Sequence, residues 1–369
     1  MEPRRNETLT HLKMRKLAYL FVLLTTVLSC NTDSEIVVAL PSEIYCNDFS
    51  AMSIYFKNLI GNNNPEAYTF KVTPNLGKQD SVKYTFPIHQ TKSEKYSLNV
   101  SVFNKSGKKV GSKSTTVFYT KLKKIPVDTI NILLTGNSLT NAGYFAGRVK
   151  SIFVDTLNFP VKFLGTKKSN GGTHEGYGGK TWKWFTQNIE SPFVFNLSEN
   201  DTTLNFKNYF ENVVQAKPDF VVVELGINDC FRADTSSVVA IDSTIDEMLK
   251  YTTVYLKSLI DYKNDIKIGV CLVPAPNSHS SGFTANYKGK YTQTGWTKIQ
   301  RRVNERYTRF FNENFKQNCS LIPLHINIDT QNAFPADNGV HPKPIGYYQL
   351  ASTIFSWLFY KIEDETWQQ

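Results

Sequence analysis

Cysteine is scarce in this chain, and its spacing does not indicate a metal site. The 369 residues contain five cysteines, at positions 30, 46, 230, 271 and 319, and no two of them form a C-x-x-C pair. A cysteine-bound metal is therefore not expected. Cys230 follows one candidate strand and Cys271 ends another, so a Cys230–Cys271 disulfide is a hypothesis that export of the chain would permit.

A concentrated basic surface is also lacking. The formal net charge is +10 and the isoelectric point is near 9.1, which favours attraction to anionic polymers or to a membrane surface. The 42 Lys and Arg residues are scattered, however, without the dense stripe that nucleic-acid binding requires. Nucleic acid is therefore not an expected partner.

The apolar stretch near the N-terminus, residues 17–28, is too short for a comfortable membrane span. The positive segment Met14-Arg-Lys precedes it, so we expect an export signal over residues 1–30. Val27-Leu-Ser-Cys30 resembles the lipobox of bacterial lipoproteins. The resemblance implies that Cys30 is lipidated and anchors the protein to a membrane, in the periplasm or on the outer surface of a bacterial cell. Ordinary cleavage beside an incidental cysteine is the alternative.

Two folded units are expected downstream of this signal. Residues 31–125 contain short β-rich stretches separated by turn residues, which is typical of a small immunoglobulin-like β-sandwich. The expected strands lie at 36–40, 51–56, 68–72, 81–86, 96–103 and 116–119. This region carries no cluster of catalytic residue types, so we interpret it as a spacer and packing partner, with sugar binding by exposed aromatic rings as the alternative.

Residues 126–369 alternate between strand and helix patterns, which predicts a parallel sheet covered by helices on both faces, a three-layer α/β/α domain. The expected strands lie at 130–134, 161–164, 220–225, 266–273 and 321–324. The expected helices lie at 142–157, 181–189, 238–262, 293–315 and 345–360. Such folds place their chemistry at the carboxyl ends of the strands.

Ser138 lies at such a position, between the strand at 130–134 and the next helix. Gly136-Asn137 supplies the turn. Taken alone, the serine is better interpreted as an ordinary helix N-cap. Three later stretches favour a functional role: Gly178-Gly179, Gly226-Ile-Asn-Asp229 and Val340-His-Pro342.

Together with Gly136-Asn-Ser-Leu-Thr140, these stretches resemble the four sequence blocks of the SGNH (GDSL-type) hydrolase family. The resemblance covers about residues 126–369 and implies a flavodoxin-like sheet of five main strands. It also implies that Ser138 is the nucleophile and His341 the base. The oxyanion hole would consist of the Ser138 and Gly179 N–H groups, with Gly178 as the fallback, and the Asn228 side chain. No cofactor or metal is implied.

Two positions depart from the family pattern. Asn137 stands where an aspartate is common, which removes a charge beside the nucleophile. The family's acid usually stands three residues before the histidine, and Asn338 occupies that position. Because an acid stabilises the protonated imidazole, we expect Asp337, four residues before His341, to reach the ring through a one-residue bulge.

Two other motifs are incomplete. Thr140 occupies the place of the second glycine of G-x-S-x-G, which disfavours an α/β-hydrolase elbow. Gly179-Lys-Thr181 looks like the end of a P-loop, but His174 stands where that motif requires glycine. A degenerate domain that binds glycans without cleaving them, and a lipase or thioesterase of the same fold, remain as alternatives.

The segment 274–296 is expected to be a long polar loop dotted with aromatic residues, and residues 191–205 form a second loop. Aromatic rings among amides and hydroxyls suit carbohydrate better than a long acyl chain. We therefore expect His174, Trp182 and Trp296 to line the substrate cleft. The expected protein is a serine esterase that removes acetyl or similar small acyl groups from an acylated glycan.

Overall fold

The computed structural model describes residues 35–365, except 62–63, 89–93 and 199–200. The expected export signal at 1–30 and its lipobox cysteine Cys30 lie outside the described residues. Within the described part of the chain, no helix is both long and apolar enough to cross a membrane.

A parallel sheet lies at the centre of the region that follows residue 126. β8 (Ile130–Gly136) pairs along its length with β14 (Phe220–Glu224), and β15 (Lys267–Cys271) and β16 (Cys319–Ile322) continue the sheet beyond it. On the other side of β8, β9 (Val161–Leu164) pairs with its first half and β11 (Gly172–Gly176) with its end. This is the expected flavodoxin-like order, with the short β10 (Lys167–Ser169) added antiparallel at the edge.

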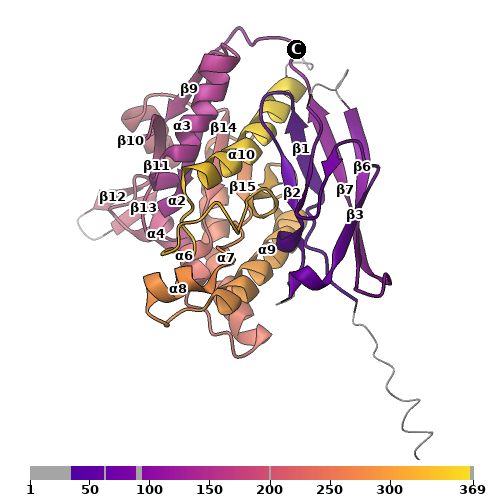
Figure 1. Ribbon diagram of the computed structural model, residues 1–369. Coiled ribbons are helices and arrows are strands. Elements are labelled where there is room, and N and C mark those ends of the chain that lie inside the picture. Colours follow the sequence, from indigo (N-terminus) through magenta and orange to yellow (C-terminus); the bar gives the residue numbers. More distant parts are fainter. Residues whose placement is uncertain (1–34, 62–63, 89–93, 199–200, 366–369) are drawn as a thin grey trace, which may run out of the picture. The chain divides into compact units, whose positions relative to one another are not determined.

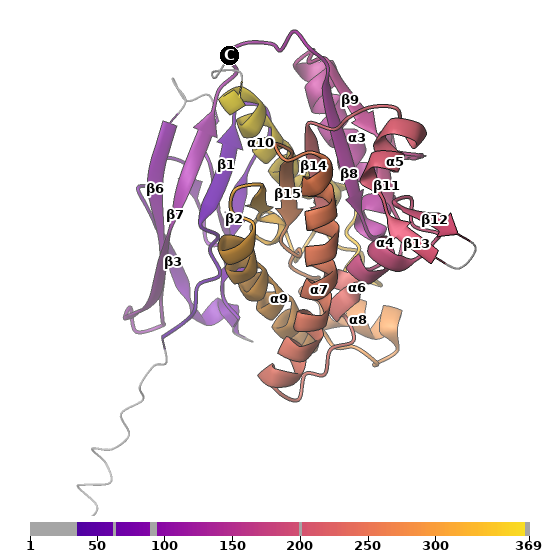
Figure 2. The same ribbon diagram turned by 180° about the vertical axis from the view of Figure 1, so that it is seen from behind.

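Helices cover both faces of this sheet, as expected. α3 (Tyr144–Ser151) and α10 (Pro344–Glu365) pack together on one face, where Figure 1 shows them in front of the strands. α4 (Trp182–Gln187), α7 (Val238–Tyr262) and α9 (Gln293–Asn314) cover the other face (Figure 2). α7 buries residues at three- and four-residue intervals, for example Ile241, Ile245 and Met248, so one apolar stripe faces the sheet.

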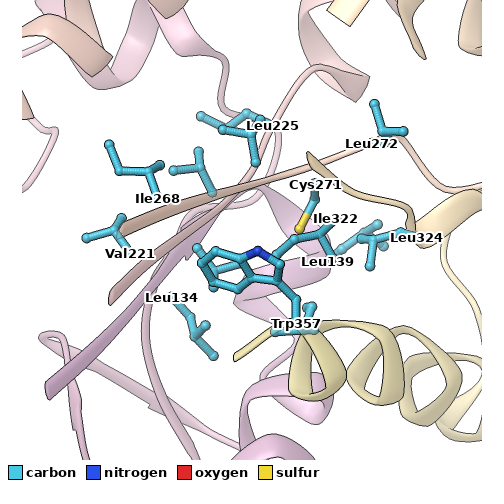
Figure 3. Close-up of a cluster of buried hydrophobic side chains, with 14 of the residues drawn as sticks. Leu134, Leu139, Val221, Leu225, Ile268, Cys271, Leu272, Ile322, Leu324 and Trp357 are labelled. Carbon is cyan, nitrogen blue, oxygen red and sulfur yellow. The ribbon is translucent and has the colours of Figure 1, made fainter. Parts of the chain in front are cut away.

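The core between the sheet and α10 is built around the indole ring of Trp357. Figure 3 shows this ring beside Leu134 of β8 and Ile322 of β16, and the ring of Phe220 on β14 lies 6.2 Å from it. A Cβ atom at Gly269, in the middle of β15, would lie 2.8 Å from the indole ring. The glycine therefore provides the space that lets a large aromatic side chain approach the strand.

The described residues before 121 are rich in β-strands, as expected, and form two sheets. β1 (Glu43–Asn47), β7 (Lys109–Thr120), β6 (Glu94–Phe103) and β3 (Thr69–Thr73) form one sheet in that order. β2 (Ser53–Tyr55), β5 (Lys83–Thr85) and β4 (Lys78–Gln79) form the other. The expected strand at 36–40 is wrong: the first strand among the described residues is β1, which pairs parallel with β7.

These β-strands pack closely on the α/β region. The ring of Tyr45 lies 5.0 Å from that of Tyr360 on α10, and Asn47 Nδ2 donates to Ser356 Oγ on the same helix at 2.7 Å. Asn58 Nδ2 donates to the backbone carbonyls of His325 and Ile328, both at 2.9 Å. Residues 37–369 consequently form one compact unit, and a domain boundary near residue 125 stays a prediction.

Three local expectations are wrong. Cys46, Cys230, Cys271 and Cys319 are all buried and free, so there is no Cys230–Cys271 disulfide. The segment 274–296 is not simply a loop, because it contains α8 (Ser280–Tyr287). The segment 191–205 contains the hairpin strands β12 (Val194–Ser198) and β13 (Asp201–Leu204).

Candidate active site

Ser138 lies where β8 ends and a short helix begins. The helix is α2 (Ser138–Asn141), and its N-cap is Asn137, whose side-chain oxygen accepts a hydrogen bond from Leu139 N at 2.9 Å. The interpretation of Ser138 as the N-cap is therefore wrong. Ser138 is partly exposed, whereas Asn137, Leu139 and Thr140 are buried. Its hydroxyl is thus free for another role.

The turn that presents Ser138 requires close backbone approach. Gly136 is paired with Gly176 of β11 on one side and Glu224 of β14 on the other. A Cβ atom at Gly136 would lie 2.2 Å from Thr140 Oγ1 and 2.4 Å from the Glu224 carbonyl oxygen. Only glycine therefore allows the chain to turn this tightly between two neighbouring strands.

His341 contacts the serine directly. The distance from His341 Nε2 to Ser138 Oγ is 2.7 Å, although the two residues are 203 positions apart. His341 lies in the turn before α10, which begins at Pro344. Proline at the first position of a helix fixes the backbone without losing a hydrogen bond. The sheet and α10 together bring the base to the nucleophile.

Asn338 fixes the orientation of the imidazole ring. Its Oδ1 accepts hydrogen bonds from Val340 N at 3.1 Å and from His341 N at 2.9 Å, and it lies 3.2 Å from His341 Nδ1. Because this oxygen is an acceptor, the proton of the neutral ring resides on Nδ1. Nε2 is then the unprotonated nitrogen, able to accept the serine proton.

The structure places Asn338, and not Asp337, beside His341. Asp337 is exposed, and among the described residues no carboxylate is hydrogen-bonded or ion-paired to the His341 ring. The expected bulge that would bring Asp337 to the ring does not form, because the Asn338 side chain already closes this turn onto the backbone. Burial lowers the pKa of His341 below its ordinary value.

A hydrogen bond connects the helix that carries the expected donor Asn228 to the turn that carries the expected donor Gly179. Asn228 is in the first turn of α6 (Ile227–Cys230), after Gly226 with φ 114°. Its Nδ2 donates to the Lys180 carbonyl oxygen at 3.0 Å. Lys180 follows Gly179, which is exposed in a turn with φ 75°. One amide hydrogen of Asn228 thus remains for a ligand, while the other ties α6 to the glycine turn.

Asp229 makes a second hydrogen bond between α6 and the residues that follow the glycine turn. Its Oδ1 accepts a hydrogen bond from Trp182 N at 2.9 Å, at the start of α4. Burial raises the pKa of Asp229 to about 7. The segment Gly226-Ile-Asn-Asp229 is therefore joined to the residues that follow Gly178-Gly179 by two hydrogen bonds, one made by Asn228 and one by Asp229.

The three residues expected to line the substrate cleft are buried. Trp182 is 0% exposed and donates from Nε1 to Tyr307 Oη at 2.7 Å, and Trp296 is 3% exposed. His174 is 1% exposed, with Nδ1 accepting from Gly176 N at 3.0 Å and Nε2 lying 2.8 Å from Ser169 Oγ. All three belong to the packing of the fold, so the expectation of direct substrate contact is not supported by their positions.

Glu224 is the residue at this site that sequence reasoning missed. It ends β14, is 2% exposed, and accepts hydrogen bonds from Asn137 Nδ2 at 3.1 Å and Thr140 Oγ1 at 3.4 Å. Burial raises its pKa to about 8, and the hydrogen bonds from Asn137 and Thr140 oppose that shift. The available signal was an acid inside the otherwise apolar run 220–225, since buried acids are rare without partners.

The arrangement is suited to nucleophilic acyl transfer. A serine hydroxyl faces an unprotonated imidazole nitrogen, the ring is oriented by a third side chain, and amide donors lie on the neighbouring loops. These are the features of a serine hydrolase on a parallel α/β sheet. The family model "GDSL-like Lipase/Acylhydrolase" matches residues 127–354, more than half of the chain, so the protein belongs to this family of acylhydrolases.

Solved structures similar to this one include carbohydrate esterases. A carbohydrate esterase family 3 protein from Talaromyces cellulolyticus is 19% identical, with a TM-score of 0.44 over 64% of this chain and 99% of the other. A family 3 carbohydrate esterase from Clostridium thermocellum is 15% identical, with a TM-score of 0.43 over 64% and 99%. No curated protein sequence matches the chain.

Proposed function

We propose that the protein is a serine esterase that removes acetyl or similar small acyl groups from a polysaccharide or oligosaccharide. The observation that carries this proposal is the 2.7 Å contact between Ser138 Oγ and His341 Nε2, with Asn338 Oδ1 on the other ring nitrogen. An intact nucleophile and base favour hydrolysis over a domain that only binds glycans.

The reaction follows from the positions of these groups. His341 Nε2 takes the hydroxyl proton as Ser138 Oγ attacks the ester carbonyl, forming a tetrahedral intermediate. The Ser138 and Gly179 N–H groups and Asn228 Nδ2 stabilise its oxyanion. The protonated imidazole then gives its proton to the sugar oxygen as the bond between this oxygen and the carbonyl carbon breaks; the sugar leaves with a free hydroxyl, and an acyl-serine remains. Water, deprotonated by His341, hydrolyses this intermediate and releases the carboxylic acid.

An aromatic surface near the oxyanion donors supports a sugar as the alcohol part of the substrate. Phe231 follows the helix that carries Asn228, and its ring lies 5.0 Å from Tyr287 and 4.7 Å from Tyr291. All three side chains are partly exposed. Aromatic faces beside polar backbone and hydroxyl groups suit the alternating apolar and polar faces of a sugar ring.

Cleavage of acetylated glycans tests the proposal. We expect acetate release from acetylated xylan or mannan, faster hydrolysis of p-nitrophenyl acetate than of long-chain esters, and loss of both activities in Ser138→Ala. A preference for long acyl chains would favour the lipase alternative. Absence of ester hydrolysis, together with no labelling of Ser138 by a fluorophosphonate probe, would refute an enzymatic function.

The cellular location is a separate proposal. The lipobox-like Val27-Leu-Ser-Cys30 supports export and anchoring of the protein to a membrane through lipid on Cys30. Incorporation of labelled palmitate into the wild-type chain, and its loss in Cys30→Ser, is the expected result. Equal incorporation in both chains would contradict the anchor.

A further inference from the structure

Glu224 is an acid in the middle of an apolar core, directly below the nucleophile turn. It is paired with Gly136 across the two central strands, and its carboxyl contacts the residue before Ser138 and the residue two positions after it. Asn137 Nδ2 donates to Oε1 at 3.1 Å and Thr140 Oγ1 to Oε2 at 3.4 Å. Both carboxyl oxygens are thus used by groups that flank the serine.

In the part of the chain that the structure describes, no opposite charge compensates this acid. Among the described residues, no lysine, arginine or histidine forms an ion pair with Glu224. The titratable groups that face it are Cys271 on β15, Tyr307 on α9 and Tyr347 on α10, all of them neutral when buried. Burying an unpaired acid is costly, so its contacts with the turn require an explanation.

The hydrogen bond with Asn137 explains why an acid is buried at position 224. Asn137 is 0% exposed, and its two side-chain ends have different tasks: Oδ1 caps α2 by accepting from Leu139 N, and Nδ2 requires a buried acceptor. Glu224 provides that acceptor. Without it, a buried amide would be unsatisfied and the side chain that starts α2 would be free to rotate.

We propose that Glu224 is a positioning residue for Ser138, acting through a matched hydrogen-bonded pair with Asn137 in which one side chain is an acid and the other an amide. This inference rests on the proposed function, because the serine that the pair holds is the nucleophile.

The pair predicts that the acid and the amide can be exchanged. In Asn137→Asp, two carboxyls face each other, and they can remain in contact only by sharing a proton. In Asn137→Asp/Glu224→Gln, the new amide nitrogen at position 224 donates to the new carboxylate at position 137, while the amide oxygen accepts from Thr140. The carboxylate at position 137 still accepts from Leu139 N. Every hydrogen bond of the wild-type turn is then restored, with donor and acceptor reversed between positions 137 and 224.

The test compares wild type, both single variants and the double variant by the rate of fluorophosphonate reaction with Ser138 and by kcat and KM for p-nitrophenyl acetate between pH 6 and 9. We expect Asn137→Asp to lower the labelling rate and kcat about tenfold at pH 8, with little change in KM. The loss of rate should become larger as the pH rises, because the proton shared by the two carboxyls is lost. Glu224→Gln alone should lower the labelling rate and kcat less than Asn137→Asp does, because its oxygen can still accept from Asn137. The double variant should recover to within about threefold of wild type and lose the added pH dependence.

An Asn137→Asp chain as active as wild type, or a double variant as slow as Asn137→Asp, would overturn the inference. Thermal unfolding of each variant separates this from a loss of fold, since a purely structural pair would change the melting temperature and leave the labelling rate of the folded fraction unchanged. A wild-type protein that is labelled at Ser138 but releases no acetate from glycans would refute the proposed substrate and leave this test intact. A wild-type protein that is not labelled would refute both.

Discussion

The described part of the chain contains two serine–histidine pairs with almost the same oxygen–nitrogen distance. Ser138 Oγ lies 2.7 Å from His341 Nε2, and Ser169 Oγ lies 2.8 Å from His174 Nε2. The second pair joins β10 to β11, and Ser169 Oγ also donates to the Asn141 carbonyl oxygen at 2.9 Å, at the end of the helix that Ser138 begins. Distance alone would therefore assign the same chemistry to both.

The other ring nitrogen distinguishes them. His341 Nδ1 faces an acceptor, Asn338 Oδ1, so Nε2 is free to accept the serine proton. His174 Nδ1 accepts from Gly176 N, so its proton resides on Nε2 and is donated to Ser169. Ser169 cannot then give its own proton to the ring. The tautomer decides which pair can act as nucleophile and base.

The largest expected effect comes from removing each serine hydroxyl in turn. Ser138→Ala should reduce kcat/KM for p-nitrophenyl acetate by about a thousandfold or more, because the nucleophile is lost. Ser169→Ala is the matched control, and it should keep activity within about threefold while lowering the free energy of unfolding by about 1 kcal/mol. Comparable losses of activity in the two variants would erase the distinction between the pairs.

The second pair, Ser169 and His174, should also affect how the stability of the protein depends on pH. Burial, with a smaller effect from Lys167, lowers the pKa of His174 from 6.5 to about 4. As the pH falls from 6.5 to 4, the unfolded chain binds a proton that the folded chain excludes, so stability decreases by up to about 3 kcal/mol. Buried His325, with a pKa also near 4, adds to this decrease.

Urea unfolding at pH 7 and pH 4.5 measures this effect. His174→Gln should shrink the difference in unfolding free energy between the two pH values, whereas the same change at the exposed His279 should leave it intact. A wild-type pH dependence in His174→Gln would mean that the His174 ring takes up its proton at the same pH in the folded and unfolded chains, which contradicts its lowered pKa in the folded protein.

A smaller effect should follow from giving the active pair a carboxylate. Asn338→Asp keeps the side-chain acceptor for His341 and supplies the missing charge, so the plateau value of kcat should rise by about three- to tenfold. Because a carboxylate favours the protonated ring, the pKa of His341 should rise and the acid limb of the pH–rate profile should shift to higher pH. Asp337→Asn changes an exposed neighbour and should alter neither quantity; a loss of activity there would restore Asp337 as the acid.

Regular elements of the fold were predictable because their patterns are strong. β9 and α7 have the bounds that their apolar periodicity predicts, 161–164 and 238–262. α8 was missed because Ser280–Tyr287 has no apolar stripe, and it is held by contacts with distant segments instead. The ring of Phe283 packs so closely on Gly339 that a Cβ atom there would lie 2.7 Å from it.

The sequence correctly predicted that Ser138 and His341 lie together. The prediction was wrong about the side chain that contacts His341 Nδ1. Preference for a charged partner pointed to Asp337, but the turn geometry favours Asn338, whose oxygen accepts from two backbone N–H groups. Burial of Trp182 and Trp296 was also unpredictable locally, since it depends on how α4 and α9 pack against α7. Sequence order indicates which segments meet, and side-chain packing determines which members of each segment are accessible.

The contact between Gly136 and Glu224 has an evolutionary consequence. A methyl group at residue 136 would collide with the backbone of residue 224, and an acid at residue 137 would confront the carboxyl there. Replacement of Gly136 is therefore penalised whatever side chain stands at 224, and an acid at 137 is penalised while 224 is also an acid. Among descendants of this gene, an acid at 137 should therefore appear together with a non-acidic residue at 224.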